Sequence, residues 1–209
     1  MKNKINFIIS TLNKFFPNPK ISLENWQNNF QLLIAVLLSG HSTDKATNSV
    51  TKILFQQIKT PKDCLLLGEN QISSLIKSVG LSQRKAYFIY HLSQDILTKF
   101  NNEVPNNLID LISLPGVGRK TANVVLSQGF NQNTFPVDTH IIRLANRWKL
   151  SNTKNPIKVE ADLIKIFPPN LFSKLHLQFI FYGRKYCPAR FHKIDHCPIC
   201  LYLKNQNTI

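Results

Sequence analysis

Apolar residues recur along this chain at intervals of three and four, and Pro, Gly or polar residues interrupt each run after a short distance. Ile5, Ile8 and Leu12 form the first such run, which ends before Pro17. The segment from Phe30 to Leu38 is apolar on every side, as a buried helix is. A spacing near 3.6 residues is that of an α-helix, and no convincing strand alternation is present. The pattern predicts an all-α fold of many short helices joined by tight turns.

Several of these runs follow a residue that can cap a helix N-terminus. The side-chain oxygen of such a residue accepts a hydrogen bond from an N–H group of the first turn. The predicted N-caps are Asp44, Thr60, Ser82, Asp138 and Asn155. Thr60 and Asn155 are each followed by a Pro, which suits the first helical position. Gly80 is expected to end a helix with a positive φ.

The charge balance of the chain is strongly positive. It has 26 Lys and Arg against 11 Asp and Glu, a formal net charge of +15, while 43% of its 209 residues are hydrophobic. That hydrophobic share is typical of a globular protein with one or two domains. The surplus indicates a polyanionic partner, either nucleic acid or an anionic membrane surface. Mutational drift in an AT-rich genome is the alternative source of part of this charge.

Several features argue against a membrane or secreted protein. The longest uninterrupted apolar run, Leu32–Leu38, is far shorter than the roughly 20 residues that span a bilayer. The basic N-terminus lacks a small-residue cleavage site, so we interpret it as an amphipathic helix. Four cysteines without an export signal predict reduced thiols, which favours metal binding or burial over disulfides. Cys64, which is far from the others in sequence, is expected to be a buried helix residue.

One segment interrupts the helical pattern with a Pro and two glycines. It reads Leu114-Pro115-Gly116-Val117-Gly118, and the helical pattern resumes at Arg119. The two glycines permit a positive φ and a close approach of the backbone to a partner. A glycine hairpin that opens onto a helix N-terminus offers N–H groups and positive potential, so a phosphate is its expected ligand. A Gly-x-Gly pair taken alone is more often a simple turn.

Two residues near this hairpin are candidates for catalysis. Lys120 lies early on the helix after the hairpin, and Asp138 follows within Val137-Asp138-Thr139-His140. Taken separately, Asp138 reads as a plain N-cap and Lys120 as a solvated cation. Their occurrence together with the Gly/Pro hairpin favours chemistry on nucleic acid.

With these motifs the chain resembles the endonuclease III family, the bifunctional DNA glycosylases and AP lyases of the helix-hairpin-helix superfamily. The matching segments are Leu32–Ser39, Gly80-Leu81, Val104-Pro105, Leu114–Leu126, Val137–Arg147 and Gly183-Arg184 before Cys187. The resemblance implies a six-helix domain with a helix-hairpin-helix at residues 22–132. It also implies a second helical domain, built from residues 1–21 and 133–209, with a cysteine loop of the iron–sulfur type. In this fold the catalytic cleft lies between the two domains.

The resemblance implies base-excision repair of double-stranded DNA that contains damaged bases, above all oxidised pyrimidines, or abasic sites. Lys120 is the implied nucleophile, which forms a Schiff base and leads to cleavage 3′ to the abasic site by β-elimination. Asp138 is expected to stabilise developing positive charge or to relay protons. A lysine at position 120 favours the lyase branch over adenine-specific relatives. A bacterial, cytoplasmic, nucleoid-associated monomer without a nucleotide cofactor is expected.

The DNA-binding residues implied by the resemblance lie around this nucleophile. Phosphates are expected to bind, without sequence readout, at Leu114, Pro115, Gly116, Val117, Gly118 and Arg119. Leu81 is expected to fill the gap that a flipped-out nucleotide leaves, and its alternative is a core leucine. His41 stands where relatives usually carry Gln near the opposite strand, and its alternative is a solvated loop residue. Two rival functions stay open: a non-catalytic hairpin module and a monofunctional glycosylase.

The C-terminal cysteines depart from the family's C-x6-C-x2-C-x5-C spacing. Cys187 is followed by a nine-residue gap, then by Cys197 and Cys200, and by no further cysteine. A [4Fe–4S] cluster ordinarily takes four thiolates. The resemblance favours that cluster, with His192, His196 or solvent at one iron. A zinc ion held by three Cys and one His, or a lost metal site, are the open alternatives.

Overall fold

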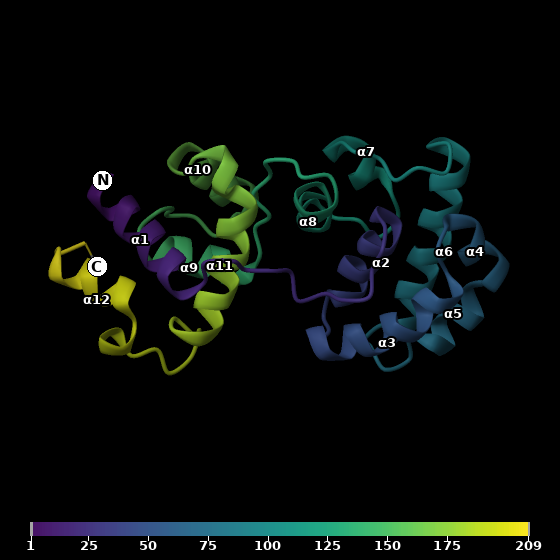
Figure 1. The fold of residues 1–209 in the computed structure, drawn as a ribbon, viewed down its shortest axis with the longest axis horizontal. Coiled ribbons are helices and arrows are strands. Elements are labelled where there is room, and N and C mark those ends of the chain that lie inside the picture. Colours follow the sequence, from purple (N-terminus) through teal and green to yellow (C-terminus); the bar gives the residue numbers. More distant parts are fainter. Residues whose placement is uncertain (1, 209) are drawn as a thin grey trace. The chain divides into compact units, whose positions relative to one another are not determined.

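The computed structural model describes residues 2–208, and in this range every regular element is a helix (Figure 1). The all-α prediction is therefore confirmed. The chain divides into two compact units, Ile21–Gln132 and the combination of Met1–Lys20 with Asn133–Ile209. We call them the central unit and the terminal unit, and each has its own apolar core. Within the described range, no helix combines the length and the apolarity that crossing a bilayer demands.

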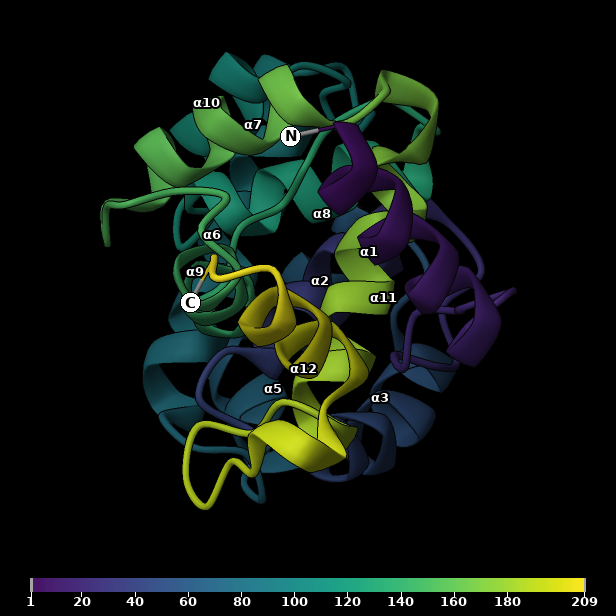
Figure 2. The same ribbon diagram turned by 90° about the vertical axis from the view of Figure 1, so that its left-hand side faces the viewer.

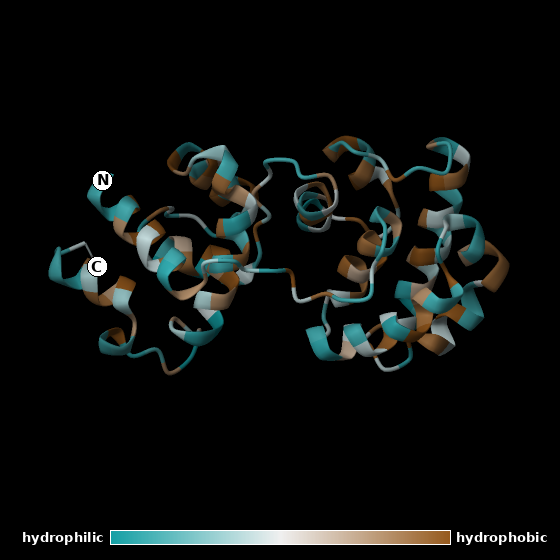
Figure 3. Ribbon diagram, viewed as in Figure 1, coloured by the Kyte–Doolittle hydropathy of each residue, from teal (hydrophilic) through white to brown (hydrophobic). Residues whose placement is uncertain are grey.

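The central unit is built around a buried helix. Its helices in the described range are α2 (Asn29–Ser39), α3 (Asp44–Gln57), α4 (Pro61–Leu67), α5 (Glu69–Leu75), α6 (Ser82–Lys99), α7 (Leu108–Ser113) and α8 (Arg119–Gly129). Every residue of α2 from Phe30 to Leu38 is buried, and Figure 3 draws this helix almost wholly in brown. The apolar run of the sequence therefore forms the predicted buried helix, against which α3, α6 and α8 pack.

This unit contains one helix more than the six that the resemblance implies, because Gly68 separates α4 from α5. Gly68 has a φ of +80°, a conformation that glycine adopts without steric cost. Helix α4 begins at the predicted cap, Thr60, whose hydroxyl accepts a hydrogen bond from the N–H of Asp63. The Asp63 carboxylate accepts one from the N–H of Thr60 in return, which completes a capping box.

Other predicted caps agree with the structure in part. Asn155 caps α10, and its side chain accepts hydrogen bonds from the next helical N–H groups. The predicted cap at Asp44 is wrong, because the hydroxyl of Thr43 accepts the hydrogen bond from the N–H of Ala46 at 3.1 Å. The helix consequently begins at Asp44, whose negative charge in the first turn suits the helix dipole.

In the turn before α6, both the N-cap and the residue with a positive φ differ from the prediction. Ser82 is the first helical residue, and the N-cap position belongs to Leu81. The positive φ expected at Gly80 is found at Leu81 instead, with a value of 61°. Glycine suits position 80 for a different reason: a Cβ there would lie only 3.1 Å from the backbone oxygen of His41.

The terminal unit joins the two ends of the chain in one core. Its helices in the described range are α1 (Lys2–Phe15), α9 (Thr139–Arg147), α10 (Pro156–Ile166), α11 (Phe172–Lys185) and α12 (Pro198–Asn205), with 3-10 turns at Pro169–Leu171 and Ile194–His196. Aromatic side chains fill the centre of this core. The ring of Trp148 lies edge-on to Phe179 and Tyr182, with centroids 4.9 and 5.5 Å apart.

Helix α1 is held by residues that lie far along the sequence. Gln178 on α11 donates hydrogen bonds to the Asn13 side chain at 3.0 Å and to the Phe16 carbonyl at 2.8 Å. The ring of Phe7 stacks on Tyr202 of α12 with centroids 3.8 Å apart. Figures 1 and 2 show α1, α11 and α12 side by side. The terminal unit is thus complete only when both ends of the chain are present.

Candidate active site and metal centre

The Gly/Pro segment forms a tight turn between α7 and α8. The N–H of Val117 donates to the carbonyl of Leu114 at 3.1 Å, with Pro115 and Gly116 between them. Gly116 has a φ of +76°, so the turn has the pattern of type II, which favours Pro and then Gly at these positions. A Cβ on Gly116 would also lie only 2.6 Å from the ring of Phe88. The segment is therefore a helix-hairpin-helix in its geometry.

Gly118 differs from Gly116 in what it needs. Its φ is −89°, and a Cβ there would meet nothing within 4 Å. It is the N-cap of α8, where it makes no side-chain cap hydrogen bond. The N–H groups at a helix N-terminus, together with the helix dipole, suit an anion. Gly118 thus keeps the backbone at this N-terminus accessible to a phosphate.

Lys120 projects from the first turn of α8 beside a pocket of the central unit. The pocket has a volume of about 310 Å³, and Lys120 lines it together with Leu81, His41, Phe88 and Gly116. All of these except Phe88 were predicted site residues, and the structure brings them together from three separate segments of the sequence. The expected burial of Lys120 is not found, because its side chain is exposed.

Leu81 and His41 share an uncommon backbone conformation at this pocket. Their φ values are 61° and 55°, in the left-handed region that side chains with a Cβ rarely adopt. Leu81 is 58% exposed, so the alternative of a core leucine is wrong. His41 is exposed as well. Strained backbone of this kind is more frequent at functional sites than elsewhere.

Lys85 also lines this pocket, although its sequence context did not predict it. Its side chain is only 5% exposed, and its ammonium group donates to the Leu38 carbonyl at 2.8 Å and to the Ser42 hydroxyl at 3.0 Å. Burial lowers the pKa of Lys85. The side chain thereby ties α6 to the loop that carries His41. Its spacing from the buried Ile89 was the available signal, since residues four apart share a helix face.

Asp138 belongs to the terminal unit and begins α9. Its Oδ1 accepts a hydrogen bond from the N–H of Ile141 at 2.9 Å, so the predicted N-cap is present. Further along α9, Arg143 donates to the carbonyls of Gly183 and Cys187 at 3.1 and 3.2 Å. These bonds anchor α9 to the end of α11 and thereby fix the helix start that presents the carboxylate.

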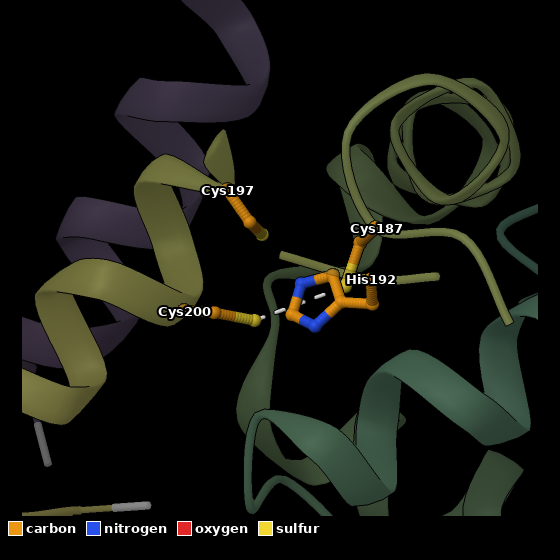
Figure 4. Close-up of side chains that lie close together, drawn as sticks. All are labelled: Cys187, His192, Cys197 and Cys200. Carbon is orange, nitrogen blue, oxygen red and sulfur yellow. Dashed lines mark hydrogen bonds between the residues drawn. The ribbon is translucent and has the colours of Figure 1, made fainter. Parts of the chain in front are cut away.

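The three C-terminal cysteines and one histidine gather in the terminal unit (Figure 4). The ligand atoms of Cys187, His192, Cys197 and Cys200 all lie within 4.8 Å of one another, and the three cysteines are fully buried. Hydrogen bonds from the neighbouring thiols of Cys187 and Cys200 lower the pKa of Cys197. His196, the other candidate ligand, is exposed and lies outside this group. The group can bind a metal ion.

Two further side chains contact the sulfur atoms. Arg147 donates to the Sγ of Cys187 at 3.2 Å and to the Pro188 carbonyl at 2.9 Å. The hydroxyl of Tyr182 lies 3.4 Å from the Sγ of Cys197 and accepts a hydrogen bond from the N–H of Ile199. Because that hydroxyl already accepts, its own proton can point at the sulfur. Partners of this kind orient metal ligands.

Cys64 lies apart from this group, in α4 of the central unit. It is fully buried, as predicted. Burial raises the pKa of the Cys64 thiol to about 12, against an ordinary value of 9.0. The thiol is therefore neutral and inert at physiological pH.

Comparison with known proteins agrees with these features. Residues 34–169 match the family described as HhH-GPD superfamily base excision DNA repair protein. Endonuclease III of Buchnera aphidicola subsp. Acyrthosiphon pisum (strain APS) is 46% identical over 203 residues, which make up 97% of this chain and 95% of that protein.

Two solved structures are similar over almost the whole chain. One is a non-covalent endonuclease III–DNA complex, with a TM-score of 0.91, 37% identity, and coverage of 100% of this chain and 99% of that chain. The other is a trapped endonuclease III–DNA covalent intermediate with an estranged adenine, with a TM-score of 0.90, 38% identity, and coverage of 95% and 93%.

Proposed function

This chain belongs to the endonuclease III family of HhH-GPD base-excision DNA repair proteins, and from this premise we propose how its own residues act on DNA. The protein is a DNA glycosylase and AP lyase that works in base-excision repair. The residue roles below, the class of damaged base, the monomeric state and the cellular location are our proposal.

The observation that carries the proposal is the position of the Lys120 amine. It stands at the N-terminus of α8, next to the hairpin, and lines the pocket with Leu81 and His41. An anion-binding turn and a nucleophile are thus adjacent in the central unit. A nucleotide whose phosphate binds at the hairpin can bring its sugar to the amine. This adjacency supports covalent chemistry at the sugar over simple phosphate binding.

Lys120 is the nucleophile in this proposal. After it gives up a proton, its nitrogen attacks C1′ of the flipped-out nucleotide, and the electron pair of the C1′–N bond leaves with the base, which takes up a proton. The nitrogen lone pair then forms the C=N bond as the C1′–O4′ bond breaks and O4′ takes up a proton, which gives a Schiff base between Lys120 and the ring-opened sugar. Loss of a C2′ proton then expels the 3′ phosphate, which cleaves the strand. Water finally hydrolyses the Schiff base and releases the free amine.

Asp138 stabilises positive charge that develops on the sugar and moves protons during these steps. A carboxylate beside an oxocarbenium-like centre lowers the barrier through electrostatic attraction. Its role as the N-cap of α9 is compatible with this one, because the cap hydrogen bond uses Oδ1 and fixes the direction of the side chain. The same residue therefore serves both the helix and the reaction.

The hairpin from Leu114 to Arg119 binds backbone phosphates, and Leu81 enters the space that the flipped nucleotide vacates. The exposure and the strained backbone of Leu81 support this role. His41 contacts the strand opposite the lesion. The variant His41→Gln, which restores the residue usual in the family, checks that contact: excision opposite A and opposite G should change in ratio, and an unaltered ratio would exclude it.

The substrate class is oxidised pyrimidines in double-stranded DNA, together with abasic sites. Damaged bases stack and pair less well, which lowers the cost of flipping them out. The protein acts as a monomer, since one chain carries the hairpin, the pocket and both catalytic residues. Its place of action is the bacterial cytoplasm, on nucleoid DNA. A panel of single-lesion duplexes, with analytical ultracentrifugation of the free protein, tests the first two statements.

Borohydride trapping on a duplex with one abasic site tests the role of Lys120. The wild-type protein should nick the strand and become covalently attached when the Schiff base is reduced. Lys120→Gln should lose both signals while it keeps its thermal stability, because the side chain is exposed. Lys62→Gln is a charge-matched control at an exposed lysine of α4 outside the pocket, and it should keep both signals.

Other outcomes separate the rival functions. Trapping of Lys120→Gln at the wild-type level would show that another amine is the nucleophile. Release of base without nicking by the wild-type protein would make it a monofunctional glycosylase. Binding without either reaction would leave only a hairpin DNA-binding module.

A further inference from the structure

We propose that Cys187, His192, Cys197 and Cys200 hold a single zinc ion in this protein, in place of the four-iron cluster that the family resemblance implies. The proposal concerns the metal site of the terminal unit and is independent of the chemistry at Lys120. It rests on the distances between the ligand atoms, on the identity of the fourth donor and on the side chains around the sulfurs.

The ligand atoms lie as close together as a mononuclear site requires. A tetrahedral zinc ion with bonds of about 2.3 Å to sulfur sets its sulfur ligands about 3.8 Å apart. The Sγ atoms of Cys187 and Cys200 are 3.8 Å apart, and all four ligand atoms lie within 4.8 Å of one another. A four-iron cluster takes one outer ligand on each iron, so its ligand atoms lie about 6 Å apart. The observed spacing fits one ion and is too short for the cluster.

The fourth donor is a histidine nitrogen. The Nε2 atom of His192 is buried and has no hydrogen-bond partner, while its ring faces the three sulfurs (Figure 4). A buried polar atom without a partner is costly, and a metal bond removes that cost. Three thiolates and one imidazole form a common donor set of structural zinc sites.

The path of the chain explains why a histidine takes this position. The residues between Cys187 and Cys197 form a loop of nine, which is long enough to return His192 to the sulfurs. The position that the family spacing assigns to the last cysteine holds Gln206, which is exposed at the end of α12. The longer loop therefore supplies the ligand that the C-terminal segment lacks.

The surroundings stabilise thiolates rather than thiols. Arg147 donates to the Sγ of Cys187, and the Tyr182 hydroxyl lies against the Sγ of Cys197. Three thiolates and one neutral imidazole around a divalent zinc leave one negative charge. The guanidinium of Arg147 balances that charge at a distance of 3.2 Å. Ligand contacts of this kind typically raise metal affinity.

Metal analysis of the full-length protein, purified without oxygen and without chelators, tests the proposal. We expect about one zinc per chain, little iron and no absorbance near 400 nm. Replacement of the zinc by Co²⁺ should give the visible bands of a tetrahedral cobalt–thiolate site. His192→Ala removes a direct ligand and should weaken zinc binding in a chelator competition by at least the roughly tenfold that loss of an outer-shell partner costs.

Matched variants keep the test decisive. His196→Ala removes an exposed histidine of the same segment and should leave zinc affinity and the Co²⁺ spectrum unchanged. His192→Cys should still bind zinc and fold, with a Co²⁺ spectrum shifted toward that of four thiolates. Four irons per chain, a folded protein without bound metal, or equal zinc affinity in wild type and His192→Ala would each overturn the proposal.

Discussion

Leu81 and His41 hold a left-handed backbone that costs a side chain with a Cβ roughly 1 kcal/mol or more. Both side chains are exposed at the same pocket, so burial of apolar surface does not offset that free-energy cost. Lys85 supplies part of the compensation, because its ammonium group fastens the loop before Thr43 to α6. At the scale of residues, the pocket therefore contains two strained positions, Leu81 and His41, and the buried Lys85 holds the segments that carry them together.

The pH dependence of stability should report on Cys64. Its pKa is raised to about 12 by burial, while the unfolded thiol has the ordinary value of 9.0. Between these values the unfolded state releases its proton first, so stability falls as pH rises above about 9. Below that pH the thiol is neutral in both states and contributes no pH dependence.

Denaturant unfolding at about pH 8 and about pH 10 measures this effect. The wild-type protein should lose about 1.4 kcal/mol more than Cys64→Ala over this interval. The comparison uses differences within each protein, so the cavity left by alanine cancels. Equal losses in the two proteins would show that the Cys64 thiol already ionises in the folded state.

Local chemistry made some residues predictable and left others undetermined. Thr60 and Asn155 were predictable as caps because the hydrogen bonds of a cap involve only neighbouring residues. The choice between His192 and His196 was open, because it depends on how a nine-residue loop folds back. Lys85 was missed because its partners lie more than 40 positions earlier in the chain.

At the scale of elements, the hairpin between α7 and α8 uses its two glycines for different purposes. Gly116 needs a positive φ and contact with Phe88, whereas Gly118 has an ordinary φ and open space beside it. The sequence motif treats both glycines alike. The hairpin itself was predictable from its composition, but this division of roles depends on the packing of α6 against the turn.

Alanine at each glycine should separate stability from DNA binding. Gly116→Ala should destabilise the fold by about 2 kcal/mol, from the left-handed backbone and from the clash with Phe88. Gly118→Ala should change stability by less than about 0.5 kcal/mol. It should nevertheless weaken DNA binding about tenfold, because a methyl group there obstructs the approach of a phosphate to the helix N-terminus.

Thermal melts and fluorescence anisotropy on an abasic duplex measure the two properties. The expected pattern is a fall in melting temperature for Gly116→Ala and a fall in affinity for Gly118→Ala at an unchanged melting temperature. Gly118→Ala with wild-type affinity would show that phosphates bind elsewhere on the protein.

At the scale of the whole molecule, the chain has too few carboxylates to balance its Lys and Arg side chains. Pairing each of the 11 carboxylates with one of the 26 cations would still leave 15 cations over. The fold depends instead on two separate apolar cores, one in each unit. The helical class followed from apolar spacing, whereas the two domains were expected only from the family resemblance. The use of the surplus charge depends on the protein surface, which apolar spacing does not describe.

The salt dependence of DNA binding should show how much of that charge contacts phosphate. We expect about six phosphates to be neutralised around one lesion, which gives a loss of about 10³ in affinity between about 50 and 200 mM salt. Titration of a labelled duplex at several salt concentrations gives the slope directly. A slope near zero would mean that the surplus does not bind DNA, and a slope near about −14, at about −0.9 per neutralised phosphate, would mean that nearly all of it does.

The construction of the terminal unit has a consequence for the synthesis of the protein. Helix α1 leaves the ribosome before the central unit, but the residues that cover Ile8 and Leu12 belong to segments after Asn133. Residues 21–132 can form their core while the remainder is still being translated. Until those segments are translated, the apolar face of α1 has no native partner and is a natural substrate for chaperones. A ribosome that stalls after residue 132 therefore leaves a folded central unit and an α1 whose apolar face is exposed and prone to aggregation.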